Sequence, residues 1–136
     1  MTTTDELVEQ ILTAESAILT VPREWLVAAV GTALEGAGYR VVLVDRAPVF
    51  DKDTLLHALY QGCAFPAYFG FNWDALADML TAKQTDDDRP MILVFQQFES
   101  LRRRAPEVAE TFLEIVGEAC GTAGGAVKRL ILLNGE

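Results

Sequence analysis

Apolar residues recur along this chain in two patterns that alternate with each other. Spacings of three and four residues are typical of amphipathic helices, whereas short runs rich in β-branched and other apolar residues are typical of strands buried on both faces. Helices are predicted over residues 5–15, 25–34, 51–62, 72–81 and 107–120. Strands are predicted over residues 18–21, 39–44, 91–95 and 127–133. This alternation favours an α/β fold with a parallel sheet.

Proline and glycine mark the ends of several predicted elements. Pro22 follows the first strand and is expected near the start of the next helix, where its missing amide does no harm. The segment 36–38, which contains two glycines, is expected to end that helix. Asp51 or Asp53 is expected to begin the following helix, and Gly62 to end it.

The composition is that of one folded domain. The 136 residues are 51% hydrophobic and 23% charged, which excludes intrinsic disorder and fibrous classes. The formal net charge is -9 at pH 7, a charge that repels phosphate backbones and anionic lipid. We therefore expect no direct binding of nucleic acid or membrane, and we favour a basic protein partner.

Location and redox state follow from two further features. Residues 1–6 contain acids where a signal peptide has basic residues, and the uncharged stretch 55–73 contains glycine and proline that would interrupt a membrane helix. Both observations favour a cytoplasmic protein. Cys63 and Cys120 give no hint of a disulfide framework and are expected to be reduced and buried.

The predicted helix 72–81 carries two carboxylates on one face. Asn72 is a suitable N-cap, and Asp74 and Asp78 lie four residues apart, where like charges cost roughly 0.2–0.5 kcal/mol. The opposite face is apolar and carries Trp73, Leu76, Met79 and Leu80. An ordinary solvated acidic face is one interpretation, and a binding surface for a cationic partner is the other.

An accumulation of aromatic residues beside this helix favours the second interpretation. Six of the twelve aromatic residues fall within fourteen positions, namely Tyr60, Phe65, Tyr68, Phe69, Phe71 and Trp73. Phe65 and Trp73 are the best candidates for the core, but the short loop between them cannot hide every ring. An exposed ring beside two carboxylates is typical of interface hot spots.

The segment from Phe65 to Thr81 resembles the signature of the barstar family, intracellular inhibitors of barnase-type ribonucleases. The shared pattern is Tyr-x-Gly-x-Asn-x-Asp-Ala-Leu-x-Asp, and it begins here at Tyr68 or Phe69. The likeness extends over residues 39–133 and takes residues 90–99 as a strand. It implies a barstar-like α/β fold with a small parallel sheet of three to four strands covered by helices. Residues 1–38 are expected to extend this single domain, residues 1–136, by a strand and a helix.

The resemblance implies an inhibitor that blocks a ribonuclease active site with the acidic helix and the aromatic loop before it. Asp78 would take the place of a substrate phosphate, Asp74 would meet the cationic rim, Tyr68 would pack on the base-binding region, and Glu118 would add an ion pair. Gly70 would allow close backbone approach. The implied partner-binding residues are Tyr68, Phe69, Gly70, Asn72, Asp74, Ala77, Asp78, Thr81 and Glu118. No catalytic residue, cofactor or metal is implied, and the expected assembly is a monomer in a 1:1 complex with a basic ribonuclease, either barnase-like or another ribonuclease toxin.

Three departures from the family pattern leave the identity of the target open. Ala77 stands where the family inhibitor has a tryptophan, and Phe71 stands where it has a glutamate. The predicted loop 82–89 lacks the family's aromatic residue and carries three consecutive aspartates, 86–88. A non-inhibitory interaction or immunity module that binds another basic protein is therefore the alternative function.

Other chemistry finds little support in the sequence. His57, the one histidine, lies among leucines and is expected to be partly buried and structural, and its spacing from Cys63 forms no dyad or metal site. The glycines within residues 31–38 match neither a Rossmann fingerprint nor a P-loop. Asp74 and Asp78 lack a third metal ligand nearby, and the basic run 102–104 is expected to be a solvated turn or an internal counter-charge.

Overall fold

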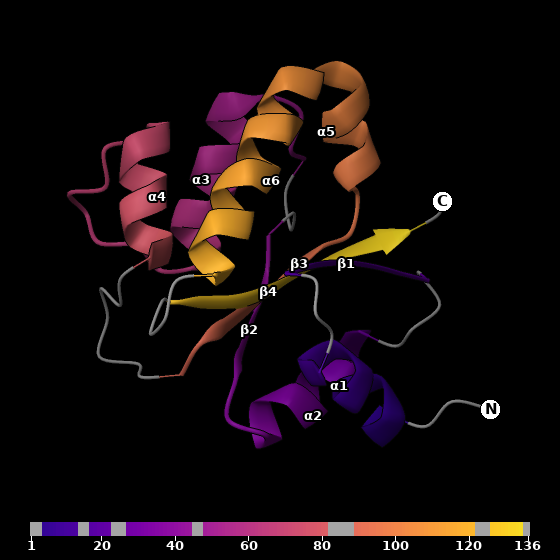
Figure 1. Ribbon diagram of the computed structural model, residues 1–136. Helices are drawn as coiled ribbons and strands as arrows, with labels where there is room; N and C mark the ends of the chain where they lie inside the picture. The colour runs from indigo at the N-terminus through magenta and orange to yellow at the C-terminus, as the bar shows by residue number, and fades with distance from the viewer. Residues whose placement is uncertain are drawn as a thin grey trace.

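The fold was analysed in a computed structural model, which describes residues 4–13, 17–22, 27–44, 48–81, 89–121 and 126–134. Within these residues helices and strands alternate, as Figure 1 shows. The helices are α1 (Thr4–Thr13), α2 (Val27–Gly36), α3 (Lys52–Gly62), α4 (Trp73–Thr81), α5 (Phe98–Arg104) and α6 (Pro106–Cys120). The strands are β1 (Ile18–Pro22), β2 (Arg40–Leu43), β3 (Met91–Phe95) and β4 (Val127–Asn134).

The four strands form one parallel sheet in the order β1-β4-β3-β2. The predicted α/β fold with a parallel sheet of three to four strands is confirmed. The strand from the N-terminal segment, β1, is added at one edge, where Leu19 pairs with Ile131 of β4. The same segment is tied to β4 a second time, because the guanidinium of Arg129 donates hydrogen bonds to the carbonyls of Ile11 and Leu12 at the end of α1, at 3.3 and 3.5 Å.

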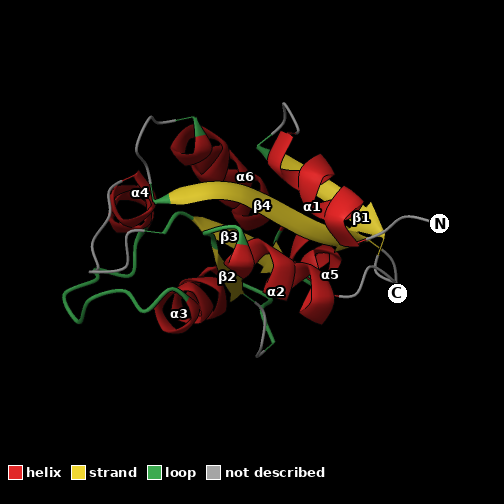
Figure 2. Ribbon diagram, turned by 90° about the horizontal axis from the view of Figure 1, so that it is seen from below, coloured by secondary structure: helices red, strands yellow, loops and turns green. Residues whose placement is uncertain are grey.

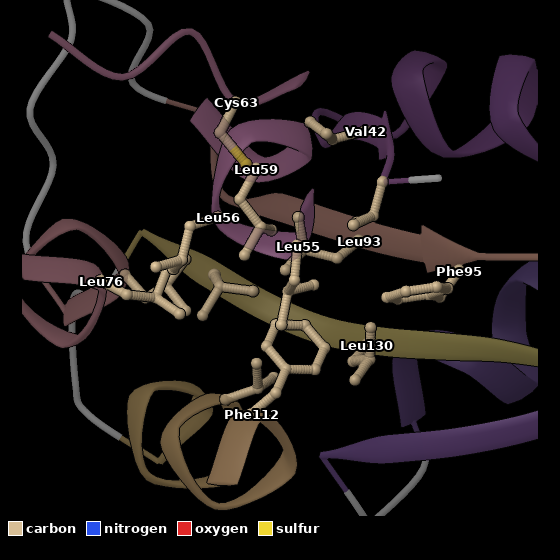
Figure 3. Close-up of a cluster of buried hydrophobic side chains, with 14 of the residues drawn as sticks. Val42, Leu55, Leu56, Leu59, Cys63, Leu76, Leu93, Phe95, Phe112 and Leu130 are labelled. Atoms are coloured by element: carbon tan, nitrogen blue, oxygen red, sulfur yellow. The ribbon is translucent and has the colours of Figure 1, made fainter. Parts of the chain in front are cut away.

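Helices cover both faces of the sheet. α3, α4, α5 and α6 lie on one face, and α1 and α2 lie on the other (Figures 1 and 2). Neighbouring residues of one strand therefore enter different cores. In β3, Leu93 enters a core under α3–α6, where it meets Leu55 and Phe112 (Figure 3), whereas Ile92 and Val94 enter a second core closed by α1 and α2. We call these the α3–α6 core and the α1–α2 core.

Local signals in the sequence explain where α3 begins. Asp51 is the N-cap, because its carboxylate accepts a hydrogen bond from the Thr54 amide at 2.8 Å and the Thr54 hydroxyl in turn accepts one from the Asp51 amide at 3.0 Å. This capping box resolves the choice between Asp51 and Asp53. The hydrogen bonds from Thr54 lower the pKa of Asp51 below its usual value of 3.8. Gly62 is the last residue of the helix, as predicted.

One expectation about element boundaries is wrong and another is not tested. Pro22 is the last residue of β1, and residues 23–26, over which the next helix was expected to begin, lie outside the described residues, so α2 is described from Val27. The strand expected over residues 90–99 ends at Phe95, and residues 98–104 form α5 instead. α5 escaped prediction because it is only seven residues long, so its buried face holds just Phe98 and Leu101.

The cysteines differ in burial. Both thiols are free, and Cys63 is buried, so that burial raises its pKa to about 12. Cys120 is only half-buried, which corrects the expectation that it lies in the core, and its pKa is raised to about 11 for the same reason. None of the described helices has the length and apolar character needed to cross a membrane. The predicted loop 83–89 with its three aspartates and the glycine-rich turn 121–125 lie mostly outside the described residues.

Candidate partner-binding site

The loop between α3 and α4, Cys63 to Asn72, presents an exposed tyrosine at its tip. We call this segment the α3–α4 loop. The amide of Phe69 donates a hydrogen bond to the carbonyl of Pro66 at 3.0 Å, and this bond closes a turn with Tyr68 near its tip. The side chain of Tyr68 is 70% exposed, the largest exposure of any large hydrophobic residue described. The sequence expectation that one ring of this loop reaches the surface is confirmed.

The remaining rings form a cluster behind Tyr68. This aromatic cluster consists of His57, Tyr60, Phe65, Phe69 and Phe71. Phe65 is buried as predicted, whereas Trp73 is only half-buried and packs against the edge of the α3–α6 core. Phe69 is buried at 4% exposure, so its side chain is turned away from the surface on which we expected it to meet a partner.

His57 is exposed, which corrects the expectation of a partly buried histidine. Its Nδ1 lies 2.8 Å from the carbonyl oxygen of Asp53, and its ring lies on Phe71 with centroids 4.5 Å apart. The neighbouring leucines misled the prediction. Leu55 and Leu59 lie one helical turn apart and point inward, whereas position 57 lies between them on the opposite side of α3.

Gly70 and Asn72 connect the loop to the start of α4. The side-chain oxygen of Asn72 accepts a hydrogen bond from the Ala75 amide at 2.7 Å, which confirms Asn72 as the N-cap. The side-chain nitrogen of Asn72, Nδ2, donates a hydrogen bond to the Gly70 carbonyl at 3.3 Å. A Cβ at position 70 would lie 3.1 Å from that same nitrogen, so a larger residue there would press on the cap. The loop and the helix are therefore positioned as one unit.

Helix α4 has the predicted two faces. Leu76, Met79 and Leu80 are buried in the α3–α6 core, and Asp74 and Asp78 are exposed on the other side. Within the described part of the chain, neither carboxylate forms an ion pair. The helix is held at its far end as well, because the Leu80 carbonyl accepts a hydrogen bond from the Ala126 amide at 3.1 Å. Two unpaired carboxylates thus stand on a firmly anchored helix.

The other predicted contact residues lie on α4 and on α6 and differ in exposure. Ala77 is half-buried between the two aspartates in sequence, and Thr81 at the end of α4 is half-buried with its hydroxyl donating to the Ala77 carbonyl at 2.8 Å. Glu118 is exposed near the end of α6, a helix that packs against α4. On the loop side, the ammonium of Lys52 lies 5.3 Å from the centre of the Trp73 ring.

The run of three arginines lies far from this face. Arg102, Arg103 and Arg104 form the last turn of α5, and α3 and α6 lie between α5 and α4 (Figure 1). Arg102 forms an ion pair with Glu99 at 2.7 Å, and the guanidinium of Arg104 lies 5.1 Å from the ring centre of Phe50. These arginines lie on a helix and not on a turn. These three arginines therefore do not neutralise the carboxylates of α4.

Comparison with known proteins adds a family and a fold. A family model described as "Barstar (barnase inhibitor)" matches residues 39–133. No curated protein matches the chain. Among solved structures, the chain is similar to the Aeropyrum pernix ORC2 protein in its ADPNP–ADP complexes, with 18% sequence identity and a TM-score of 0.61 over 96% of this chain. The match spans 39% of that longer protein, and an identity this low indicates a shared fold alone.

Proposed function

This chain belongs to the barstar family, whose model spans residues 39–133, and from that premise we propose that it inhibits a basic ribonuclease. The inhibitor would cover the ribonuclease active site with α4 and the α3–α4 loop. We assign no catalytic residue to the chain. The partner-binding residues of the proposal are Tyr68, Phe69, Gly70, Asn72, Asp74, Ala77, Asp78, Thr81 and Glu118.

The observation that carries the proposal is a pair of exposed carboxylates on α4, which form no ion pair within the described residues, next to a loop whose tip carries an exposed tyrosine. A ribonuclease must concentrate positive charge to hold the phosphates of its substrate, and a carboxylate on a rigid helix complements that charge without being cleavable. Asp78 would occupy the position of a phosphate, Asp74 would meet the cationic rim, and Glu118 would add an ion pair. Tyr68 would pack on the base-binding region of the enzyme.

The remaining residues of the set would shape or border this surface. Phe69 would hold the turn that carries Tyr68, because its ring is buried. Gly70 leaves room for the partner's backbone, and Asn72 fixes the start of α4 by its hydrogen bond to Ala75. Ala77 and Thr81 would lie at the margins of the contact, since both are half-buried.

The net charge of -9 adds a long-range effect. An acidic inhibitor and a basic enzyme attract each other before contact, and such steering raises association rates at low salt. Fast association benefits the cell, because the free ribonuclease would degrade the cell's RNA. We propose that the protein acts in the cytoplasm as a monomer in a 1:1 complex, with residues 1–38 as part of the same domain.

One observation favours the second candidate, an interaction or immunity module that binds a basic protein without inhibiting a ribonuclease. Phe71 stands where the family inhibitor has a glutamate, and its ring is directed into the aromatic cluster. That position therefore offers no charge to a partner. A partner with a different distribution of cations would suit this surface better than barnase.

Inhibition of RNA cleavage by a panel of small basic ribonucleases, barnase included, tests the proposal. We expect stoichiometric inhibition that weakens as salt rises. Asp78→Asn should weaken binding by about 10-fold or more, as expected at an interface hot spot. Glu35→Gln is the matched control, because Glu35 is also an exposed carboxylate but lies on α2 at the opposite face of the sheet, and it should change affinity less than twofold.

Two results would contradict the proposal in different ways. Equal and small losses for Asp78→Asn and Glu35→Gln would exclude α4 as the contact surface. Absence of inhibition for every ribonuclease of the panel would favour the non-inhibitory module.

A further inference from the structure

The α3–α4 loop holds a non-glycine residue in a left-handed conformation at each end. Ala64 and Phe71 have φ angles of 55° and 53°, and among the described residues they alone do so without being glycine. A side chain with a Cβ disfavours this region, and bulky residues disfavour it most. Such strain persists only where the surroundings enforce it, and it is frequent at ligand-binding segments.

The strain at Ala64 has an ordinary cause. Ala64 follows the end of α3, and the next amide, that of Phe65, donates a hydrogen bond to the Tyr60 carbonyl at 3.1 Å. A left-handed residue at this position is a common way to end a helix. Phe71 lies in front of a helix, where no such motif applies, so its conformation needs another explanation.

The surroundings of Phe71 are aromatic rings. Its ring centroid lies 4.5 Å from that of His57, 4.9 Å from that of Phe69 and 5.1 Å from that of Tyr60. Two of these neighbours are accounted for by packing, because Phe69 is buried and Tyr60 is half-buried. His57 is exposed, so the core does not require it, and its ring lies against that of Phe71.

Phe71 occupies the junction between the two parts of the proposed binding surface. The turn that carries Tyr68 closes at Phe69, two residues before it, and the N-cap of α4, Asn72, follows directly after it. The backbone angle at position 71 therefore sets the direction of the turn relative to α4. A change of that angle would move Tyr68 with respect to Asp74 and leave both elements intact.

We propose that the contact between His57 and Phe71 is a positioning device, which holds the α3–α4 loop in its partner-binding conformation before the partner arrives. The inference rests on the proposed function for its purpose, but the ordering of the loop is a property of the free protein. His57 acts through Phe71 and the loop and does not itself touch the partner.

This arrangement makes a kinetic prediction. If the loop is preset, loss of the His57 ring lowers the fraction of molecules competent to bind, and the observed association rate falls by that fraction. The complex, once formed, is unchanged, so the dissociation rate stays the same. A residue that contacted the partner directly would instead act mainly on dissociation.

The test compares three variants of the full chain. His57→Ala removes the ring from an exposed position, His57→Phe keeps a ring there, and Gln61→Ala is the matched control, one helical turn further along α3 and equally exposed. Hydrogen exchange at the Phe69 amide reports opening of the turn, because that amide donates to the Pro66 carbonyl. Stopped-flow association with barnase reports the kinetics.

We expect His57→Ala to speed exchange at the Phe69 amide by about 3- to 10-fold, the range that loss of one ring pair supports. Association with barnase should slow at every salt concentration by the fall in the closed fraction, a smaller factor than the change in exchange because the loop of the wild type is mostly closed, with dissociation unchanged. His57→Phe should restore both values, and Gln61→Ala should alter neither. Phe71→Leu, which loses the ring and with it all three ring contacts, should act in the same direction as His57→Ala and at least as strongly.

Unchanged exchange at Phe69 in His57→Ala would overturn the inference, and so would a loss that appears in dissociation. The wild-type chain could fail to bind barnase while His57→Ala still speeds exchange at the Phe69 amide. That pair of results would count against the proposed function with this enzyme and would support the ordering of the loop by His57. The two proposals can therefore fail separately.

Discussion

The two helical layers of this protein cover the same sheet but differ in what they contribute. The layer of α3–α6 carries the carboxylates of α4, the exposed Tyr68 and the left-handed Phe71. The layer of α1 and α2 comes entirely from residues before the family match, and the described residues of its two helices include no left-handed residue. In the proposed function, recognition therefore belongs to one face of the sheet, and the residues before the family match cover the other face.

The strands show why the second layer is needed. Ile92, Val94, Ile131 and Leu133 all turn away from α3–α6 and are at most 7% exposed because α1 and α2 lie over them. A sheet with a solvated face would carry polar residues at such positions. These apolar residues fit a sheet covered on both faces, and residues 1–38 supply the cover.

The strongest test of this comparison is deletion of residues 1–38. The deletion exposes four large apolar side chains of β3 and β4, each worth about 1.5–3 kcal/mol when buried. Their sum is comparable to the whole stability of an ordinary domain, about 5–15 kcal/mol. We expect the remaining chain to lose its cooperative urea transition, followed by circular dichroism. A fragment that unfolds at the midpoint of the full chain would show that the second layer is dispensable and that residues 39–133 fold alone.

The same leucine-to-alanine substitution in each core compares how tightly the two cores are packed. Leu93 is fully buried in the α3–α6 core, whereas Leu133 is 7% exposed in the α1–α2 core. Leucine-to-alanine changes in cores cost about 2–5 kcal/mol and cost more where the cavity cannot relax. We expect the loss of unfolding free energy to lie near the upper end of that range for Leu93→Ala and near the lower end for Leu133→Ala. Urea unfolding measures both losses. Equal losses would mean that the two cores are equally well packed.

The elements of both layers were largely predictable from the sequence, but their assignment to a face was not. Helical apolar periodicities and short apolar runs located nine of the ten helices and strands described, because burial imposes these patterns on the sequence. The run Met91–Phe95 is apolar at every position, so nothing in it indicates which of Leu93 and Val94 faces which helical layer. α5 was missed because two buried residues are too few to establish a period.

The candidate site was predictable in its helix and less so in its loop. Asn72 as a cap and the exposed Asp74 and Asp78 follow from local rules of helix formation. The burial of Phe69, the exposure of His57 and the left-handed angle at Phe71 depend on which rings meet in three dimensions. No local rule predicts a left-handed phenylalanine, because the sequence signal for that conformation is glycine or asparagine.

A change at the cap of α4 tests whether the site layer is held by local interactions as well as by its core. Asn72→Ala removes the acceptor of the Ala75 amide, which should cost about 1 kcal/mol of unfolding free energy. Asn72→Asp keeps an acceptor and should cost much less. A thermal melt of the three proteins measures the difference. Equal melting temperatures for all three would indicate that the cap contributes nothing in this context.

The smallest expected effect is a pH dependence of the stability that Asp51, the N-cap of α3, contributes. Hydrogen bonds from Thr54 lower the pKa of Asp51 in the folded chain below 3.8, so the folded state favours the charged form. This contribution is present above pH 3.8 and is lost as the pH falls through the lowered pKa, when the carboxylate takes up a proton. The stability gap between wild type and Asp51→Asn should therefore shrink between pH 6 and pH 3, as measured by urea midpoints. A gap that stays constant over this range would show that the capping box stabilises α3 by geometry alone, without regard to the charge of its carboxylate.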